Sequence, residues 1–322
     1  MELVCVDLGG TNVRFAIAEA EAGKVCHLGE PVTLQTADYP GLDSAWAAYA
    51  VHAGRPLPRG AGVAIACPIS GDVLKLTNSP WLIRPASLAA ELGVEQLTLV
   101  NDFGAVGHAI AQLPAAHLKY VAGPDVPLPE AGVIGVVGPG TGLGVTHVLR
   151  GAFGYAVMET EGGHIDWAPV DTIEDAILQR LRQRFLRVSA ERIVSGPGLR
   201  NIYGYLAELE GRPVAAQDDK TLWKAALGGT DRVAVAALER FCQCLGSVAG
   251  DIALAQGAQG MVIAGGIGAR LADRLPRSGF SERFVAKGRM EAMLSRVPVK
   301  LITHPEPGLF GAAAAFAREH AS

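Results

Sequence analysis

Short apolar runs rich in valine, isoleucine and leucine recur along the chain, and most are followed by glycines or a polar pair. Runs of this kind are typical of strands buried on both faces of a sheet. The predicted strands are residues 3–6, 13–17, 32–35, 62–67, 97–100, 132–137, 145–149, 260–264 and 299–302.

Longer segments between these runs carry an apolar residue at every third or fourth position, which predicts helices. Asp171 and Glu174 form a capping pair before one of them, and the longest has Leu238, Phe241 and Leu245 on one face. The predicted helices are residues 44–53, 85–92, 104–111, 171–185, 198–210, 221–227, 231–256 and 308–318. The first part of the chain therefore has the order β-β-β-α-β-α-β-α.

Two strand pairs are each joined by a glycine-containing turn, at residues 7–12 and 138–144. A dinucleotide fingerprint or a Walker A loop has a helix directly after its glycines, so neither is present here. A Gly-Gly-Thr turn between strands can still wrap a phosphate, because glycines let backbone N–H groups come close. The first turn alone also fits an ordinary hairpin, whereas the several glycines of the second would be unnecessary in one. Because the arrangement occurs twice, we predict two similar halves that each offer a glycine turn to one phosphate chain.

Polar residues follow several of the predicted strands. Asp102 follows the strand that ends near Asn101, and ligands bind at the carboxyl ends of strands in open α/β sheets. Asp102 is either a functional carboxylate or only the N-cap of the next helix.

Other polar positions have two interpretations each. The glycines between Glu161 and His164 would let both side chains point into one pocket, although a lone histidine is more often structural. Glu191 is a third polar candidate. Asn78, with Trp81, either lines a pocket or lies in a surface loop with a docked tryptophan. The pair Gly265-Gly266 either leaves room for a base or ribose or forms a close-packed turn.

Composition narrows the classes of protein. The chain has 322 residues, 49% of them hydrophobic, which favours two domains. Its 28 basic and 32 acidic residues include no basic run, so no nucleic acid or anionic membrane partner is expected. The acidic start is no signal peptide, and we expect no bilayer-spanning run. Five cysteines without a spaced framework indicate reduced thiols in a cytoplasmic protein without structural zinc.

Six ordered motifs together resemble the bacterial glucokinase family, the hexokinase-like sugar kinases of the actin/Hsp70-type ATPase fold. They run from Cys5 to near Gly311 and comprise residues 7–14, 100–103, 138–144, 161–164, 189–198 and 264–267. The resemblance implies a two-lobed α/β, ribonuclease H-like fold with a duplicated β-β-β-α-β-α core and a central cleft. It places residues 1–112 and 303–322 in a smaller domain and residues 113–302 in a larger one.

The same resemblance implies a role for each matching residue. Asp102 would be the catalytic base, and the sugar hydroxyls would be held by Asn101, Asp102, Glu161, His164, Glu191 and Asn78. The first phosphate loop would be Asp7, Gly9, Gly10, Thr11 and Asn12, with Asp7 facing Mg²⁺ through water. The second loop would be Gly138, Gly140, Thr141, Gly142 and Gly144, and Gly265 and Gly266 would contact adenosine.

The implied activity is the ATP-dependent phosphorylation of D-glucose to glucose 6-phosphate, a step of glycolysis. Members of the family often form homodimers, but no stretch of this sequence specifies an interface. One rival is a kinase for mannose, fructose or an N-acetylated hexose. Another is a sugar-binding regulatory protein without catalysis, but this chain keeps Asp102 and the phosphate-loop glycines. It lacks the cysteine cluster of the related zinc-containing repressor-like kinases, and we expect neither zinc nor a DNA-binding extension before Met1.

Overall fold

The fold was analysed in a computed structural model that describes residues 1–76, 79–213 and 218–321. The chain divides into two compact units. Unit 1 contains Met1–Pro114, Val157–Glu159 and His304–Ser322, and unit 2 contains Ala115–Ala156 and Thr160–Thr303.

Unit 1 is built on a six-stranded sheet in the order β3-β2-β1-β5-β8, with β4 paired to β2. Strands β1, β5 and β8 are parallel, whereas β2 runs antiparallel to β1. Its strands are β1 (Glu2–Leu8), β2 (Asn12–Glu21), β3 (Lys24–Leu28), β4 (Val32–Gln35), β5 (Gly60–Ile65) and β8 (Gln96–Asn101), and β6 (Leu74–Lys75) and β7 (Leu82–Ile83) form a separate hairpin. Its helices are α1 (Leu42–Ala53), α2 (Pro85–Leu92), α3 (Asp102–Gln112) and α11 (Pro307–Glu319).

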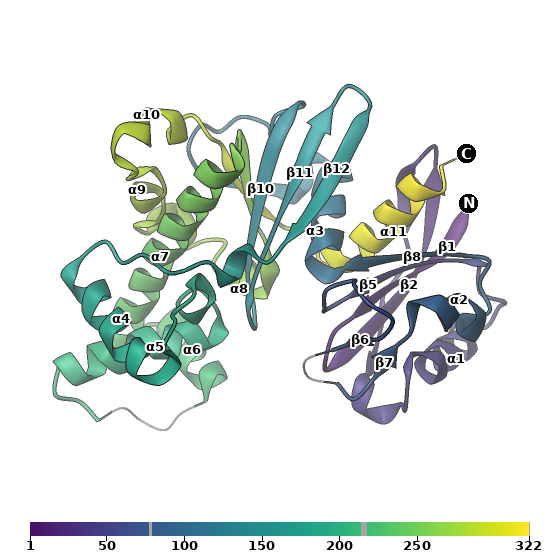
Figure 1. The fold of residues 1–322 in the computed structure, drawn as a ribbon, viewed down its shortest axis with the longest axis horizontal. Helices are drawn as coiled ribbons and strands as arrows, with labels where there is room; N and C mark the ends of the chain where they lie inside the picture. The colour runs from purple at the N-terminus through teal and green to yellow at the C-terminus, as the bar shows by residue number, and fades with distance from the viewer. Residues whose placement is uncertain (77–78, 214–217, 322) are drawn as a thin grey trace. The chain divides into compact units, whose positions relative to one another are not determined.

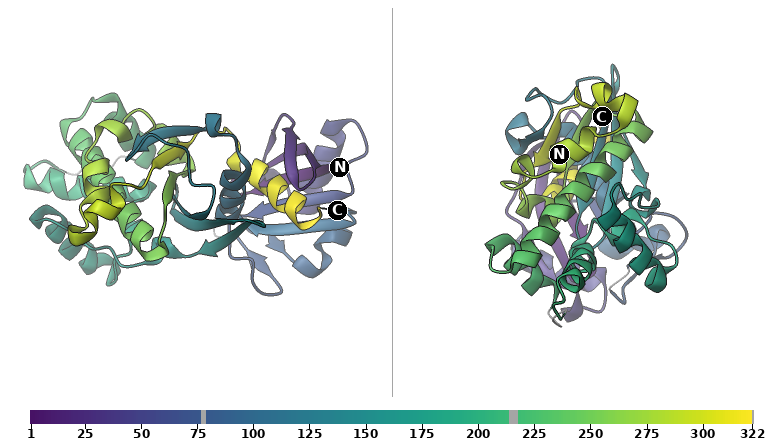
Figure 2. Two further views of the ribbon diagram at one scale, coloured as in Figure 1. Left: turned by 90° about the horizontal axis from the view of Figure 1, so that it is seen from above. Right: turned by 90° about the vertical axis from the view of Figure 1, so that its left-hand side faces the viewer.

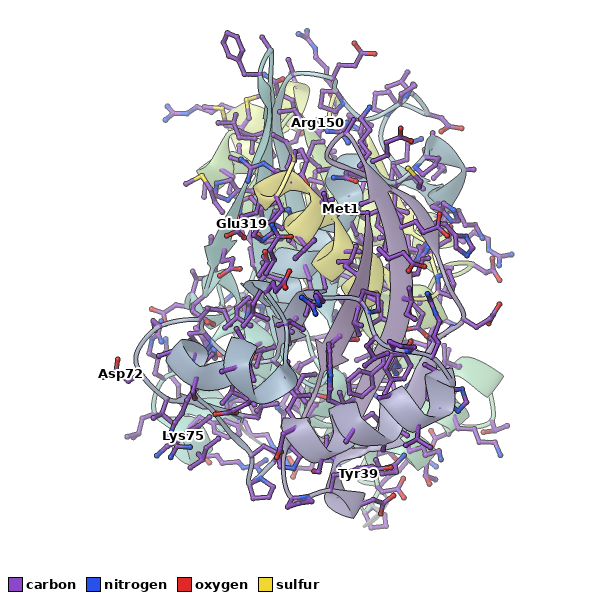
Figure 3. All side chains as sticks on the ribbon, turned by 90° about the vertical axis from the view of Figure 1, so that its right-hand side faces the viewer. Met1, Tyr39, Asp72, Lys75, Arg150 and Glu319 are labelled. Carbon is purple, nitrogen blue, oxygen red and sulfur yellow. The ribbon has the colours of Figure 1, made fainter. Side chains whose placement is uncertain are left out.

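Both faces of this sheet are buried, which explains why β1 has an unbroken apolar run. Alternate residues of a strand point to opposite faces. Val4 and Val6 pack in a core with residues of α1 and α2, and Leu3 and Cys5 pack in a second core with residues of α11. Helix α11 lies along the sheet (Figure 1), and Figure 3 labels Glu319, its last residue, together with Met1, which precedes β1.

Unit 2 is built on a second six-stranded sheet in the order β12-β11-β10-β13-β14-β9. Its strands are β9 (Leu118–Ala122), β10 (Gly132–Pro139), β11 (Leu143–Gly151), β12 (Gly154–Thr160), β13 (Gly260–Ile263) and β14 (Val299–Ile302). Its α-helices are α4 (Thr172–Phe185), α5 (Gly196–Leu209), α6 (Asp219–Gly228), α7 (Arg232–Gln256), α8 (Gly265–Arg270), α9 (Phe280–Val285) and α10 (Glu291–Leu294). Helices α4 to α7 and α9 gather beside the sheet around one large core (Figures 1 and 2).

The two sheets repeat one arrangement. In each, an antiparallel pair, β1-β2 or β10-β11, is followed by two parallel strands, β5-β8 or β13-β14. The joining turn contains glycines in both cases. This confirms the predicted duplicated α/β core and places both glycine turns at the same topological position.

Several elements were missed or misjudged in length. Strand β3 was not predicted, because its exposed sequence has no apolar run, and neither were β9, β12, α9 and α10. The second glycine turn was predicted too long. Gly138 pairs with Gly144 within the β10-β11 ladder, so only residues 140–142 turn. Glycine favours turns, but ladder hydrogen bonds on both sides override that preference here.

Among the described residues, one helix, α7, is long and apolar enough to cross a membrane by length and composition alone. Within its most apolar window, 72% of the residues are buried inside the fold. Its apolar character therefore serves the core of unit 2.

Helices α3 and α11 approach each other closely at Gly311. A Cβ atom at this glycine would lie 1.7 Å from the Ala105 carbonyl oxygen, a backbone atom of α3. Only glycine fits this contact, which fixes α11 against the helix that begins with Asp102.

Replacing Gly311 with alanine should therefore destabilise unit 1 by about 3 kcal/mol, because one of the two helices must move away. Urea unfolding of the variant measures the loss. The Gly151→Ala variant is the control, because a Cβ there meets no atom within 4 Å. Equal midpoints for the two variants would contradict the close packing.

His108 of α3 is buried, and burial, with a contribution from Arg318, lowers its pKa from 6.5 to about 4. The folded protein then binds this proton only near pH 4, whereas the unfolded chain binds it below about 6.5. Stability should therefore fall as the pH drops through this window, by about 2 kcal/mol between pH 7 and pH 5. The unfolding free energy of His108→Gln, measured at both pH values, should lack this component. If the unfolding free energies of the wild type and of His108→Gln fell equally between pH 7 and pH 5, His108 would not be the source of this loss.

Candidate active site

Asn101 and Asp102 lie where β8 ends and α3 begins. The Asn101 side-chain oxygen accepts hydrogen bonds from the backbone N–H groups of Phe103 and Gly104, at 2.9 and 3.2 Å. Its amide nitrogen donates to the Cys67 carbonyl at 3.1 Å. Asn101 is thus the N-cap of α3 and ties it to the end of β5.

Asp102 is the first residue of α3, so its interpretation as the N-cap was wrong. It is half-buried, and its Oδ1 accepts a hydrogen bond from the Phe103 N–H at 2.8 Å. Burial and the Asp102 charge both raise the pKa of the Cys67 thiol, which keeps that thiol protonated beside the carboxylate.

Glu159, which the sequence analysis missed, contacts the same junction. Its Oε1 accepts a hydrogen bond from the Asn101 N–H at 2.9 Å. No motif marks this glutamate, because its contact depends on β12 bringing a distant segment to unit 1.

The first glycine turn is held by Thr36, the residue directly after β4. Gly9 N–H donates to the Asn12 carbonyl at 3.0 Å and closes the turn. Thr36 donates its hydroxyl to the Gly10 carbonyl and its N–H to the Thr11 carbonyl. These bonds occupy carbonyl groups, so the turn holds a fixed shape in which N–H groups can be offered to a phosphate.

Asp7 lies at the end of β1 beside two partners. Its Oδ2 is 3.2 Å from Nη1 of Arg14, and Nε of Arg14 is 3.6 Å from Oε2 of Glu306. Burial raises the pKa of Asp7, and Arg14 opposes that shift. Gly308 leaves room for the carboxylate, since a Cβ there would lie 2.8 Å from Oδ2.

The donor set around Asp7 fits a magnesium ion carried by a nucleotide. Among the described residues, no group of three or more His, Cys, Asp or Glu side chains could hold a metal ion. Mg²⁺ typically keeps several waters and uses one or two carboxylates together with substrate phosphates. A single carboxylate at the glycine turn meets that requirement.

The second glycine turn contacts Glu191 in unit 2. Oε2 of Glu191 accepts a hydrogen bond from the Leu143 N–H at 3.1 Å. A Cβ atom on Gly142 would lie 2.4 Å from the same oxygen, so glycine makes room for this contact. The Gly140 carbonyl accepts a hydrogen bond from Gly196 at the start of α5. Thr141, in the turn itself, is exposed.

Glu161 and His164 lie on the short 3-10 helix Gly162–His164 and its N-cap. Oε2 of Glu161 is 3.7 Å from Nε2 of His164, and both side chains are exposed. Gly163 packs directly on Leu143, the residue whose N–H binds Glu191. The structure thus brings both glutamates and the histidine to one end of β11.

Gly265 and Gly266 begin α8. Gly265 has a φ of +76°, and a Cβ there would lie 2.6 Å from the Pro139 carbonyl oxygen. A close-packed turn therefore explains Gly265. A Cβ on Gly266 meets no atom within 4 Å, so the backbone there is open to a ligand.

Asn78 lies outside the described residues. Trp81 is 2% exposed, and its indole N–H donates to the Tyr39 carbonyl at 2.9 Å. The prediction that Trp81 is a docked tryptophan is therefore confirmed. Figure 3 labels Tyr39 and also Lys75, the last residue of β6.

Comparisons with known proteins show the family to which this chain belongs. The sequence model of the family described as Glucokinase matches residues 4–319. A glucokinase of Zymomonas mobilis is 56% identical over 320 residues, with 99% of both chains covered. A solved glucokinase structure from an Antarctic psychrotroph is 35% identical, with 98% of each chain covered and a TM-score of 0.86.

A more distant structure shares the fold alone. It is a ROK family glucokinase from Streptomyces griseus, solved with glucose and AMPPNP, with 19% identity and a TM-score of 0.63. The match covers 97% of this chain and 98% of the Streptomyces griseus chain. The family model and the full-length identity together show that this chain belongs to the glucokinase family.

Proposed function

We propose that this chain transfers the γ-phosphoryl group of ATP to the 6-hydroxyl of D-glucose, with Asp102 as general base. The observation that carries the proposal is a carboxylate fixed at the end of a parallel strand by the Asn101 cap, in a chain 56% identical to a glucokinase. ATP is the phosphoryl donor and glucose is the acceptor.

Phosphoryl transfer needs mainly positioning and charge neutralisation, with one group to accept the proton of the attacking hydroxyl. Asp102 is suited to accept that proton. Its backbone is fixed by the first turn of α3, and its side chain is half-buried. The proton passes from the sugar hydroxyl to the carboxylate as the oxygen attacks the γ-phosphorus.

Glucose carries several hydroxyls, and each one buried without a partner costs about 1–3 kcal/mol. Asn101 and Asp102 supply such partners from unit 1. Glu161, His164 and Glu191 supply them from unit 2, where they lie near one end of β11. Asn78 would add an amide.

The two glycine turns hold the phosphates of ATP through backbone N–H groups. Their equal topological positions in the two sheets support this role. Asp7 would hold Mg²⁺, which would supply neutralisation of the phosphate charge. Gly266 has the open backbone that a contact with adenosine requires, and Gly265 sets the turn that presents it.

The two units correspond to the lobes of a kinase. We assign residues 1–112 and 303–322 to the smaller lobe, where Asp102 and Asp7 lie, and residues 113–302 to the larger one. The close contact of Gly311 with Ala105 supports the place of the C-terminal helix in the smaller lobe.

The test is a steady-state assay with MgATP in which ADP and sugar phosphate are followed separately. Glucose should react well ahead of mannose, fructose and N-acetylglucosamine, with equal amounts of ADP and glucose 6-phosphate. A faster reaction with another hexose would show that this hexose is the preferred acceptor. Tight glucose binding without turnover would indicate a sugar sensor instead.

Replacing Asp102 with asparagine should keep the fold and lower kcat by a factor on the order of 10² or more, because the proton acceptor is lost. Thermal unfolding and glucose binding check that the protein is intact. Turnover close to that of the wild type would remove Asp102 from the role of base.

Replacing Glu191 with glutamine should raise the KM for glucose roughly tenfold, because a charged acceptor becomes a neutral one. The amide oxygen can still accept the Leu143 N–H, so the glycine turn should keep its shape. Glu208→Gln, which changes a surface ion pair with Arg180 in the same unit, is the matched control. An unchanged KM for Glu191→Gln would show that this residue serves only the turn.

A further inference from the structure

Strand β8 lies at one edge of its sheet, since β5 is its one strand partner among the described residues. An edge strand leaves one row of backbone groups without a strand partner. Asn101, the last residue of β8, has its N–H on Glu159 instead of on another strand, at 2.9 Å from Oε1. The bond lies at the residue directly before Asp102.

Asn101 is thereby held at three atoms. Its side-chain oxygen caps α3, its side-chain nitrogen binds the Cys67 carbonyl, and its backbone N–H binds Glu159. The first two bonds fix the side chain. The third fixes the peptide plane between Val100 and Asn101, one residue before Asp102.

At Gly104 the absence of a side chain leaves room for Glu159. A Cβ atom on Gly104 would lie 2.2 Å from Oε1 of Glu159 and 2.8 Å from its Cγ and Cδ. All three nearest atoms belong to the Glu159 side chain, so the missing Cβ leaves room for that side chain. The carboxylate also lies in the first turn of α3, where the helix dipole favours a negative charge.

We propose that Glu159 is a positioning residue for phosphoryl transfer, which acts by holding the Asn101 peptide and through it the base Asp102. This inference rests on the proposed function. Glu159 acts at the junction of β8 and α3, where Gly104 leaves room for it, and the group that it binds is the backbone N–H of Asn101.

The pair offers two independent ways to break one contact. Glu159→Ala removes the acceptor, and Gly104→Ala displaces the acceptor while improving helix propensity at that position. Each should lower kcat about tenfold with the KM for glucose within twofold, because a small misplacement of a reacting group slows the chemistry. The double variant should be no slower than either single variant.

Glu159→Gln retains a side-chain oxygen for the Asn101 N–H and should restore kcat to within about threefold of the wild type. Glu30→Gln, an exposed glutamate of unit 1 in the loop before β4, is the matched control and should be unchanged. Hydrogen exchange at the Asn101 amide gives a readout apart from turnover, and it should be faster in Glu159→Ala and Gly104→Ala than in the wild type.

The outcomes separate the two proposals. If wild-type protein does not phosphorylate glucose, the proposed function fails and this inference fails with it. If the wild type is active and Asp102→Asn is not, but Glu159→Ala and Gly104→Ala keep full kcat, only this inference is overturned. Additive losses in the double variant, or unchanged exchange at Asn101, would also overturn it.

Discussion

The junction of β8 and α3 depends on the side chain of Asn101, which makes hydrogen bonds in both directions. Toward the helix it accepts two N–H groups that α3 cannot satisfy internally, and toward the sheet it donates to Cys67 at the end of the neighbouring strand. Because one side chain satisfies both elements, the direction in which α3 leaves the sheet is fixed. Asp102 therefore takes its place at the start of α3 from the Asn101 cap and from the edge strand β8.

Close backbone contacts at glycine provide the second constraint on this structure. Gly311 brings α11 against α3, Gly104 accommodates Glu159, and Gly142 accommodates Glu191. In each case an atom of another element occupies the space that a Cβ atom would need. These glycines therefore act through packing, and a propensity argument that treats glycine only as a turn former does not account for them.

The predictable part of the fold followed from local pattern. The buried strands beginning near Leu3, Gly132 and Val299 were found because both of their faces are covered, which leaves a continuous apolar run. Strand β3 was missed because it is exposed at the sheet edge, where polar residues are tolerated. The short helices α9 and α10 carry too few residues for a period to be recognised.

The residues of the candidate site also divide into those that the sequence could place and those that it could not. Asp7 and Asp102 could be placed from sequence because each follows a recognisable strand, and Glu191 and His164 because they lie in motifs that resemble a known family. Glu159 and Glu306 could not be placed, since each reaches its partner, Asn101 or Arg14, from a segment far away in sequence. A carboxylate that acts on a backbone N–H needs no particular neighbours in sequence, only a fold that delivers it. The residues proposed to touch substrate are thus marked by local motifs, whereas the residues proposed to hold them in place become visible only through tertiary contacts.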